Sequence, residues 1–163
     1  MAPITLYGPD PTQIAGNVKI ALGEKFADIL APKMAELQID ATCAITSFGT
    51  TTDPSYKERQ DLCMKDAREW LEKRIRKLEP MTIRASKTAE AAVLALLAED
   101  AEVGFFVRPY EDSDTALAVG DKGWAFTARV AKVDPNPIVV GSDYEWAVEF
   151  YDVQRSLLAV LAA

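Results

Sequence analysis

Residues 143–153 read DYEWAVEFYDV, and large apolar side chains occupy every second position of this stretch. The apolar series consists of Tyr144, Trp146, Val148 and Phe150. Successive side chains of a β-strand point to opposite faces of the sheet, so this spacing predicts a strand with one face on a core. The opposite face carries the carboxylates of Glu145 and Glu149. The strand alone leaves open whether that face meets water, a partner subunit or a cavity whose charge matters.

Most of the remaining pattern also predicts strands. Alternating or β-rich segments occupy residues 17–22, 38–47, 102–108 and 124–133. The last of these is followed by DPNP, so we expect it to stop there and to form a hairpin with the 143–153 strand. One helix is expected at about residues 87–99, where Ser86 or Thr88 can cap the N-terminus. Its apolar stripe would be Ala89, Val93, Leu96 and Leu97.

Four segments are expected to lie outside this regular pattern. Residues 1–16 are rich in proline and glycine and predict an extended arm. Residues 48–61 are polar and unpatterned, and they predict a long loop. Residues 154–163 form a short apolar tail. Residues 64–78 fit a helical stripe but also alternate in part, and we expect a helix or turn to about Lys77 and a strand from about Glu79.

The residue content argues against catalysis. The chain contains no histidine and has a net charge of −7. The usual general base and the commonest metal ligand are therefore missing. The acidic run Glu111, Asp112 and Asp114, with Asp121, lacks the glycine and the spacing of an EF-hand calcium loop. We therefore predict no catalytic residue, no cofactor site and no metal site.

Charge and hydropathy also limit the partners. The acidic residues outnumber the basic ones, 25 against 18, which argues against binding to a phosphate backbone. No apolar run is long enough for a membrane-spanning helix, so we expect no membrane insertion. The two cysteines, Cys43 and Cys63, are expected to be reduced and mostly buried, although their spacing leaves a disulfide between them open.

Several motifs occur in a distinctive order. ADILAPKMAEL, at residues 27–37, leads into a cysteine-bearing strand with Cys43, and the second cysteine follows a polar loop in DLC. A helix then enters a strand of the form G-x-x-V-R, at Gly104, Val107 and Arg108. In this order the chain resembles the major tail tube proteins of long, flexible-tailed bacteriophages of the siphovirus type, especially those of actinobacterial hosts.

The resemblance implies a single mostly β domain over residues 1–163, a β-sandwich with one flanking helix. It further implies a structural virion protein, made in the host cytoplasm, whose six-membered rings stack into the tail tube. The implied partners are other copies of the chain and the tape measure, tail terminator and tail-tip proteins. DNA would pass through the tube without specific binding. The alternatives are a cytosolic β-rich binding domain and the tube protein of a related contractile injection system.

The candidate site residues belong to two groups. The resemblance and the loop positions give the expected assembly residues, which are Asp28, Pro32, Glu36, Asp53, Tyr56 and Arg59. The charge of the outer strand face gives the expected lumen residues, Glu145 and Glu149, because carboxylates repel the phosphates of passing DNA where lysines would bind them.

Overall fold

The structure is a computed structural model that describes residues 16–59 and 68–163. The expected N-terminal arm, apart from its last residue, and Cys63 lie outside the described residues.

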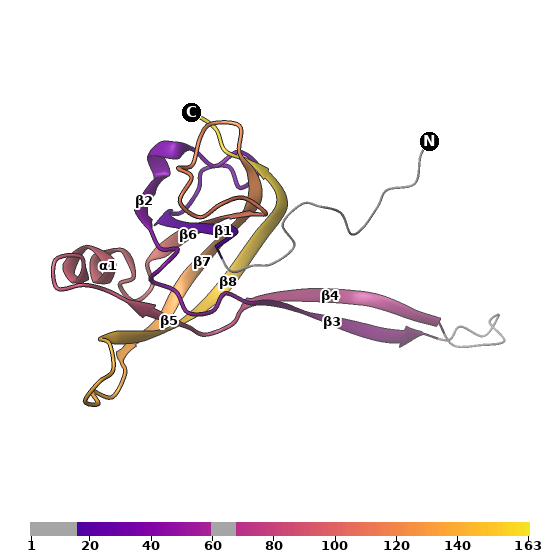
Figure 1. The fold of residues 1–163 in the computed structure, drawn as a ribbon. Helices are drawn as coiled ribbons and strands as arrows, with labels where there is room; N and C mark the ends of the chain where they lie inside the picture. Colours follow the sequence, from indigo (N-terminus) through magenta and orange to yellow (C-terminus); the bar gives the residue numbers. More distant parts are fainter. Residues whose placement is uncertain (1–15, 60–67) are drawn as a thin grey trace.

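Figure 1 shows a curled antiparallel sheet from which a long two-stranded arm projects. The sheet order is β2-β1-β6-β7-β8-β5. Its strands are β1 (Val18–Glu24), β2 (Leu37–Asp40), β5 (Met81–Arg84), β6 (Glu102–Pro109), β7 (Lys122–Pro135) and β8 (Glu145–Val160).

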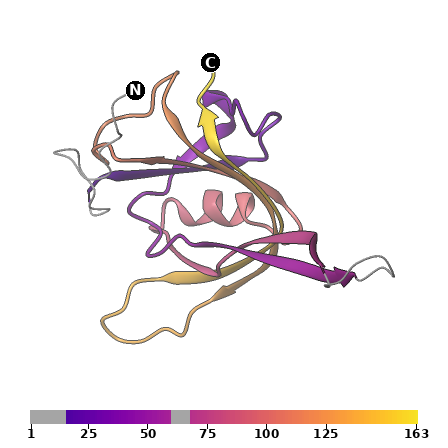
Figure 2. The same ribbon diagram turned by 90° about the vertical axis from the view of Figure 1, so that its right-hand side faces the viewer.

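The main core lies inside the curl of this sheet. Figure 2 shows α1 (Glu90–Leu96), the one α-helix among the described residues, between the two halves of the sheet. Val93 and Leu97 pack from the helix side against buried side chains of β6, β7 and β8, among them Phe105, Phe126 and Val148. Burial of large apolar side chains is the dominant stabilising term in a fold of this size. The expected β-rich fold with one helix is therefore confirmed.

A smaller core covers the opposite face of β6 and β7. Phe106 and Ala125 point to this face, whereas their neighbours Phe105 and Phe126 point into the main core. Phe26, Ala159 and Leu161 cover them. β6 is thus buried on both faces, which explains its nearly continuous apolar sequence.

The strand at residues 143–153 is confirmed in its central part and is longer than expected. Trp146, Val148 and Phe150 pack on the main core, and β7 is the expected hairpin partner of β8. Tyr144 is the exception, because it precedes β8 and is exposed. The expected tail is also part of the sheet, since β8 continues to Val160 and Leu161 is buried.

The expected helix at 87–99 is present but shorter. α1 contains only Glu90–Leu96, and no side chain caps its first turn. The Ser86 hydroxyl forms a hydrogen bond with the Thr88 hydroxyl. Two residues of the expected stripe, Val93 and Leu97, are buried as predicted, and Leu96 packs beside them. No helix among the described residues is long and apolar enough to cross a membrane.

The expectations for residues 48–61 and 64–78 were wrong. β3 (Thr50–Arg59) occupies most of the polar segment, and β4 (Arg68–Leu78) replaces the expected helix or turn. The two strands pair with each other over their whole length. Among the stripe residues whose side chains are described, Leu71 and Ile75 are exposed and Leu78 reaches the core, so the stripe does not form a buried helical face. Pairing with β3 satisfies the backbone groups along one edge of β4, and water can satisfy those along the other edge, so the strand needs no buried face.

The segment after β2 also differs from expectation. The strand expected over 38–47 ends at Asp40, because the N–H groups of Ala44 and Ile45 donate to the Ala41 carbonyl and form a turn. Cys43 lies in this turn as a free, exposed thiol rather than a buried one. The backbone beyond the turn then borders β5, where Ile45 faces Ile83.

Candidate assembly surface

The β3–β4 hairpin, here called the arm, is the most prominent surface feature (Figure 1). Ten residues of β3 extend over about 33 Å at ~3.3 Å per residue. The arm is fixed at its base, where the Glu79 N–H donates to the Gly49 carbonyl at 2.9 Å and Leu78 is buried in the main core. A projecting pair of strands exposes polar edges that can contact another chain.

The arm differs in charge from the rest of the chain. Its strands contain seven basic and four acidic residues, a net charge of +3, whereas the whole chain has a charge of −7. The excess comes from β4, at Arg68, Lys73, Arg74, Arg76 and Lys77. The exposed apolar side chains Tyr56, Leu71 and Ile75 lie among these charges. A basic arm on an acidic protein is electrostatically complementary to the body of a second copy.

All three assembly residues expected between 48 and 61 lie on β3. Asp53 forms an exposed ion pair with Lys77 at 2.6 Å. Tyr56 is 59% exposed, and Arg59 is the last residue of β3, opposite Arg68. The cations of β4 were missed as site residues because the intervening glutamates suggested an ordinary solvated face.

Of the other three expected assembly residues, Asp28 and Glu36 make contacts within their own loop and Pro32 joins it to the C-terminal end of the chain. The Asp28 carboxylate accepts the Leu30 N–H at 2.9 Å. The Glu36 carboxylate accepts the N–H groups of Ala27 and Lys33 at 3.1 and 2.8 Å. The buried Pro32 accepts the Ala162 N–H at its carbonyl, which ties the loop to the C-terminal end of the chain. These contacts show that Asp28, Pro32 and Glu36 shape the loop over the smaller core.

A buried arginine holds the long loop between β6 and β7. Arg108 is 1% exposed. Its guanidinium pairs with Asp121 at 2.9 Å, and it donates to the carbonyl groups of Asp112, Thr115 and Ala116. Its Nε lies 3.3 Å from the Glu111 carboxylate without hydrogen-bond geometry. The acidic run that might have suggested calcium therefore surrounds an internal cation, and the described residues contain no cluster that could hold a metal.

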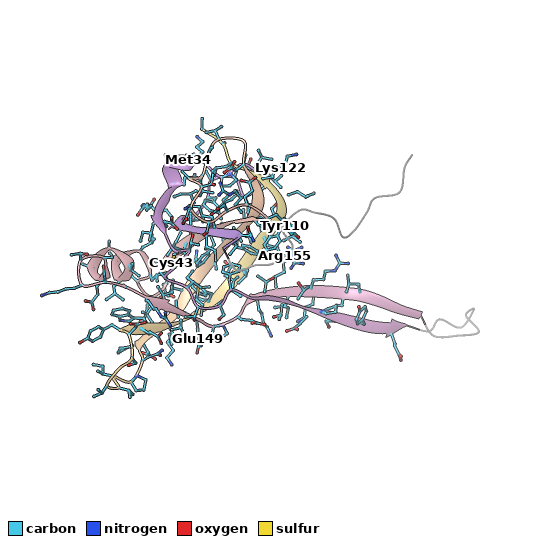
Figure 3. All side chains as sticks on the ribbon, viewed as in Figure 1. Met34, Cys43, Tyr110, Lys122, Glu149 and Arg155 are labelled. Carbon is cyan, nitrogen blue, oxygen red and sulfur yellow. The ribbon has the colours of Figure 1, made fainter. Side chains whose placement is uncertain are left out.

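The expected lumen residues lie on the outer face of β8, with cations beside them. Glu145 pairs with Arg84 at 2.9 Å, and this hydrogen bond holds the pKa of the Glu145 carboxyl below its ordinary value. Glu149 is exposed and lies opposite Lys132 of β7. Figure 3 shows Glu149 toward the β7–β8 end of the molecule. The face is thus a mixture of charges rather than a purely acidic one.

Further along the same face a second network joins β6, β7 and β8. Glu102 accepts from Lys25 at 3.0 Å and from Arg129 at 2.7 Å. The hydrogen bonds from Lys25 and Arg129 lower the pKa of the Glu102 carboxyl. Because these side chains are exposed, each pair contributes little to the free energy of unfolding.

The structure is thus a curled antiparallel sheet from which a long, basic two-stranded arm projects. The family model of phage tail tube proteins matches residues 9–163. The chain therefore belongs to the phage tail tube protein family, and its place is the virion tail. This membership implies a structural rather than an enzymatic role. A search of curated proteins found no match.

Proposed function

We propose that this chain, as a single domain, forms six-membered rings that stack into the tail tube of a siphovirus-type phage with an actinobacterial host. The tube is the conduit for DNA into the host cell. The observation that carries the proposal is the arm, which is attached at its base and, apart from Leu78, contributes none of its described side chains to either core. The unpaired edges of such a long hairpin would favour aggregation unless another chain contacts them.

The symmetry of such a tube requires different surfaces on its two contacting subunits. A head-to-tail contact closes into a ring when the rotation allows it, and a second contact stacks the rings. The outer edge of β2 and the edges of the arm are available for strand pairing, since β2 pairs only with β1 within the described residues. The arm, with its positive charge, reaches the acidic body of a neighbouring subunit. The tape measure, terminator and tail-tip proteins complete the tail, and the subunits are made in the host cytoplasm.

The direct test is assembly of the purified protein. Size-exclusion chromatography followed by negative-stain electron microscopy is expected to show rings and, at higher concentration, tubes of uniform diameter with six-fold end views. A protein that stays monomeric at every concentration and salt tested, or rings of another symmetry, would contradict the proposal.

We further propose that the outer face of β7 and β8 lines the channel, with Glu145 and Glu149 contributing to its charge. The net charge of −7 on every subunit favours a lumen that repels DNA, because counterion-releasing lysine contacts would retain it. The pairing of Glu145 with Arg84 weakens the field of that carboxylate, so Glu149 is the more effective of the two.

Replacing both Glu145 and Glu149 with lysine is expected to leave ring formation intact and to slow DNA ejection from assembled virions. The delay should increase at low salt, because the Debye length is about 10 Å at 0.1 M and ~30 Å at 0.01 M. A double glutamine variant provides the matched control, since it removes negative charge without adding positive charge, and it should show a smaller delay. Ejection at the normal rate from the lysine variant at every salt concentration would make both glutamates ordinary surface residues.

A further inference from the structure

Three consecutive apolar residues at the tip of the β7–β8 loop have no partner within the described chain. Ile138, Val139 and Val140 are 81%, 61% and 103% exposed. Soluble proteins rarely expose such a run unless another molecule covers it. Figure 1 shows this loop beyond the ends of β7 and β8, on the side away from the C-terminus.

Hydrogen bonds close the turn at the tip. The Ser142 hydroxyl donates to the Val139 carbonyl at 2.7 Å, and the Ser142 N–H donates to the same oxygen at 3.0 Å. Gly141 adopts a positive φ of 89°, which closes the turn without strain. At the base of the loop, the Asn136 N–H donates to the Glu145 carbonyl at 2.9 Å. A preorganised apolar tip loses little conformational entropy when it binds.

A pocket of matching chemistry opens elsewhere on the same chain. It has a volume of about 580 Å³, within the ~300–1,000 Å³ of pockets that hold small ligands. Its apolar walls are Val18, Ile20, Ile45, Phe48, Val107 and Trp124. Thr42, Ser47 and Tyr110 give it polar groups that can accept or donate hydrogen bonds to a loop backbone. The pocket therefore fits a short apolar turn with a polar backbone.

The tip and the pocket of one chain do not face each other. Trp124, one wall of the pocket, precedes Pro135 by eleven residues along β7, which corresponds to roughly 36 Å at ~3.3 Å per residue. The tip follows Pro135 and points away from the body in both views. Two complementary surfaces at different places on one chain can meet only between copies, in a head-to-tail contact.

We propose that the tip formed by Ile138, Val139 and Val140 inserts into the pocket of a neighbouring subunit. The occupant of the pocket is a second copy of this chain, and the contact is one of the two that build the tube. This inference rests on the proposed self-assembly and adds an apolar knob-and-pocket contact to the charged contact of the arm. It also gives Trp124 a function as a pocket wall in addition to its packing on the core.

Cross-linking can test this contact because the free, exposed Cys43 lies between Thr42 and Ile45 at the pocket. In a Cys63→Ser background, Val140→Cys treated with a short bismaleimide is expected to give a ladder of covalent dimers, trimers and larger oligomers. A head-to-tail contact produces a ladder, whereas a tip-to-tip contact produces dimers only. Adding Cys43→Ser should abolish the ladder, and Val119→Cys, at another exposed apolar residue, should give none.

A second variant measures the effect on assembly. Val140→Asp is expected to leave the melting temperature unchanged, because Val140 has no contact to lose, and to reduce tube formation at least tenfold. Three results would each overturn the contact. They are cross-linked dimers only from Val140→Cys, a ladder that survives Cys43→Ser, and normal tubes from Val140→Asp. Tubes from Val140→Asp without a ladder from Val140→Cys would leave the tail tube role intact. A Cys43-dependent ladder from protein that never forms tubes would support the contact and count against the proposed function.

Discussion

Replacement of residues 51–77 by a short glycine-serine turn is expected to give a folded monomer that forms no tubes. The replacement keeps Thr50 and Leu78, which face each other at the base of the arm. It also keeps the hydrogen bond between Glu79 and Gly49, so the chain can close at this point without distortion. The cores keep every buried residue that the structure describes in them, because Leu78 is the only described arm residue among these.

Circular dichroism and thermal melting would show whether the shortened monomer is folded, and electron microscopy would show whether it assembles. Removal of β3 alone would be a poorer experiment, since β4 would then lose its backbone partner over its whole length. Normal tubes from a folded, armless subunit would remove the arm from the assembly surface.

Point substitutions can separate the charge of the arm from its length. Arg74 and Arg76 are exposed and form no ion pair within the described residues. Their replacement by glutamate changes the arm from +3 to −1, and we expect it to slow assembly strongly at low salt and less at high salt. The double variant Lys87→Glu and Lys122→Glu is a matched control, because it makes the same charge change on exposed residues outside the arm. Equal slowing by both pairs would show that net charge, and not the arm, is responsible.

Arg108→Met is expected to cost about 3–5 kcal/mol of the free energy of unfolding, the range for removal of one partner from a buried ion pair. The substitution preserves much of the side-chain volume but leaves Asp121 and three backbone carbonyls without their donor. The loop at residues 110–121 would then lose the group around which it is folded. The Ala118 N–H would remain as a donor to Asp121, which does not replace a cation.

Arg129→Met is the control for this experiment. Arg129 also forms ion pairs, with Glu102 and Asp152, but its side chain is 43% exposed. Its loss should cost less than about 1 kcal/mol, as for other exposed pairs. Urea denaturation of both variants, with limited proteolysis of the 110–121 loop, would compare them. Equal destabilisation by the two substitutions would contradict the structural importance of the buried site.

Sequence alone determined the parts of this protein in which local pattern and burial agree. The alternation of Trp146, Val148 and Phe150 predicted β8 because each of these side chains packs on the core. The helix near Val93 and Leu97 was predicted for the same reason, since these two of the four residues in its expected stripe are buried. The absence of histidine and the motifs of residues 27–37 and 104–108 pointed to a structural tail tube protein, and the family match confirms that class.

Only the tertiary structure decided the features that depend on which backbone segments and side chains meet in space. β4 has a helix-like sequence, but it becomes a strand because β3 pairs with it and no core covers its apolar stripe. Arg108 looked like one basic residue in a strand motif, and only the fold places the 110–121 loop around it. Glu145 looked like a free carboxylate until β5 brought Arg84 beside it. In each case the deciding contact depends on the path of the backbone in space, so periodicity and composition carry no signal for it.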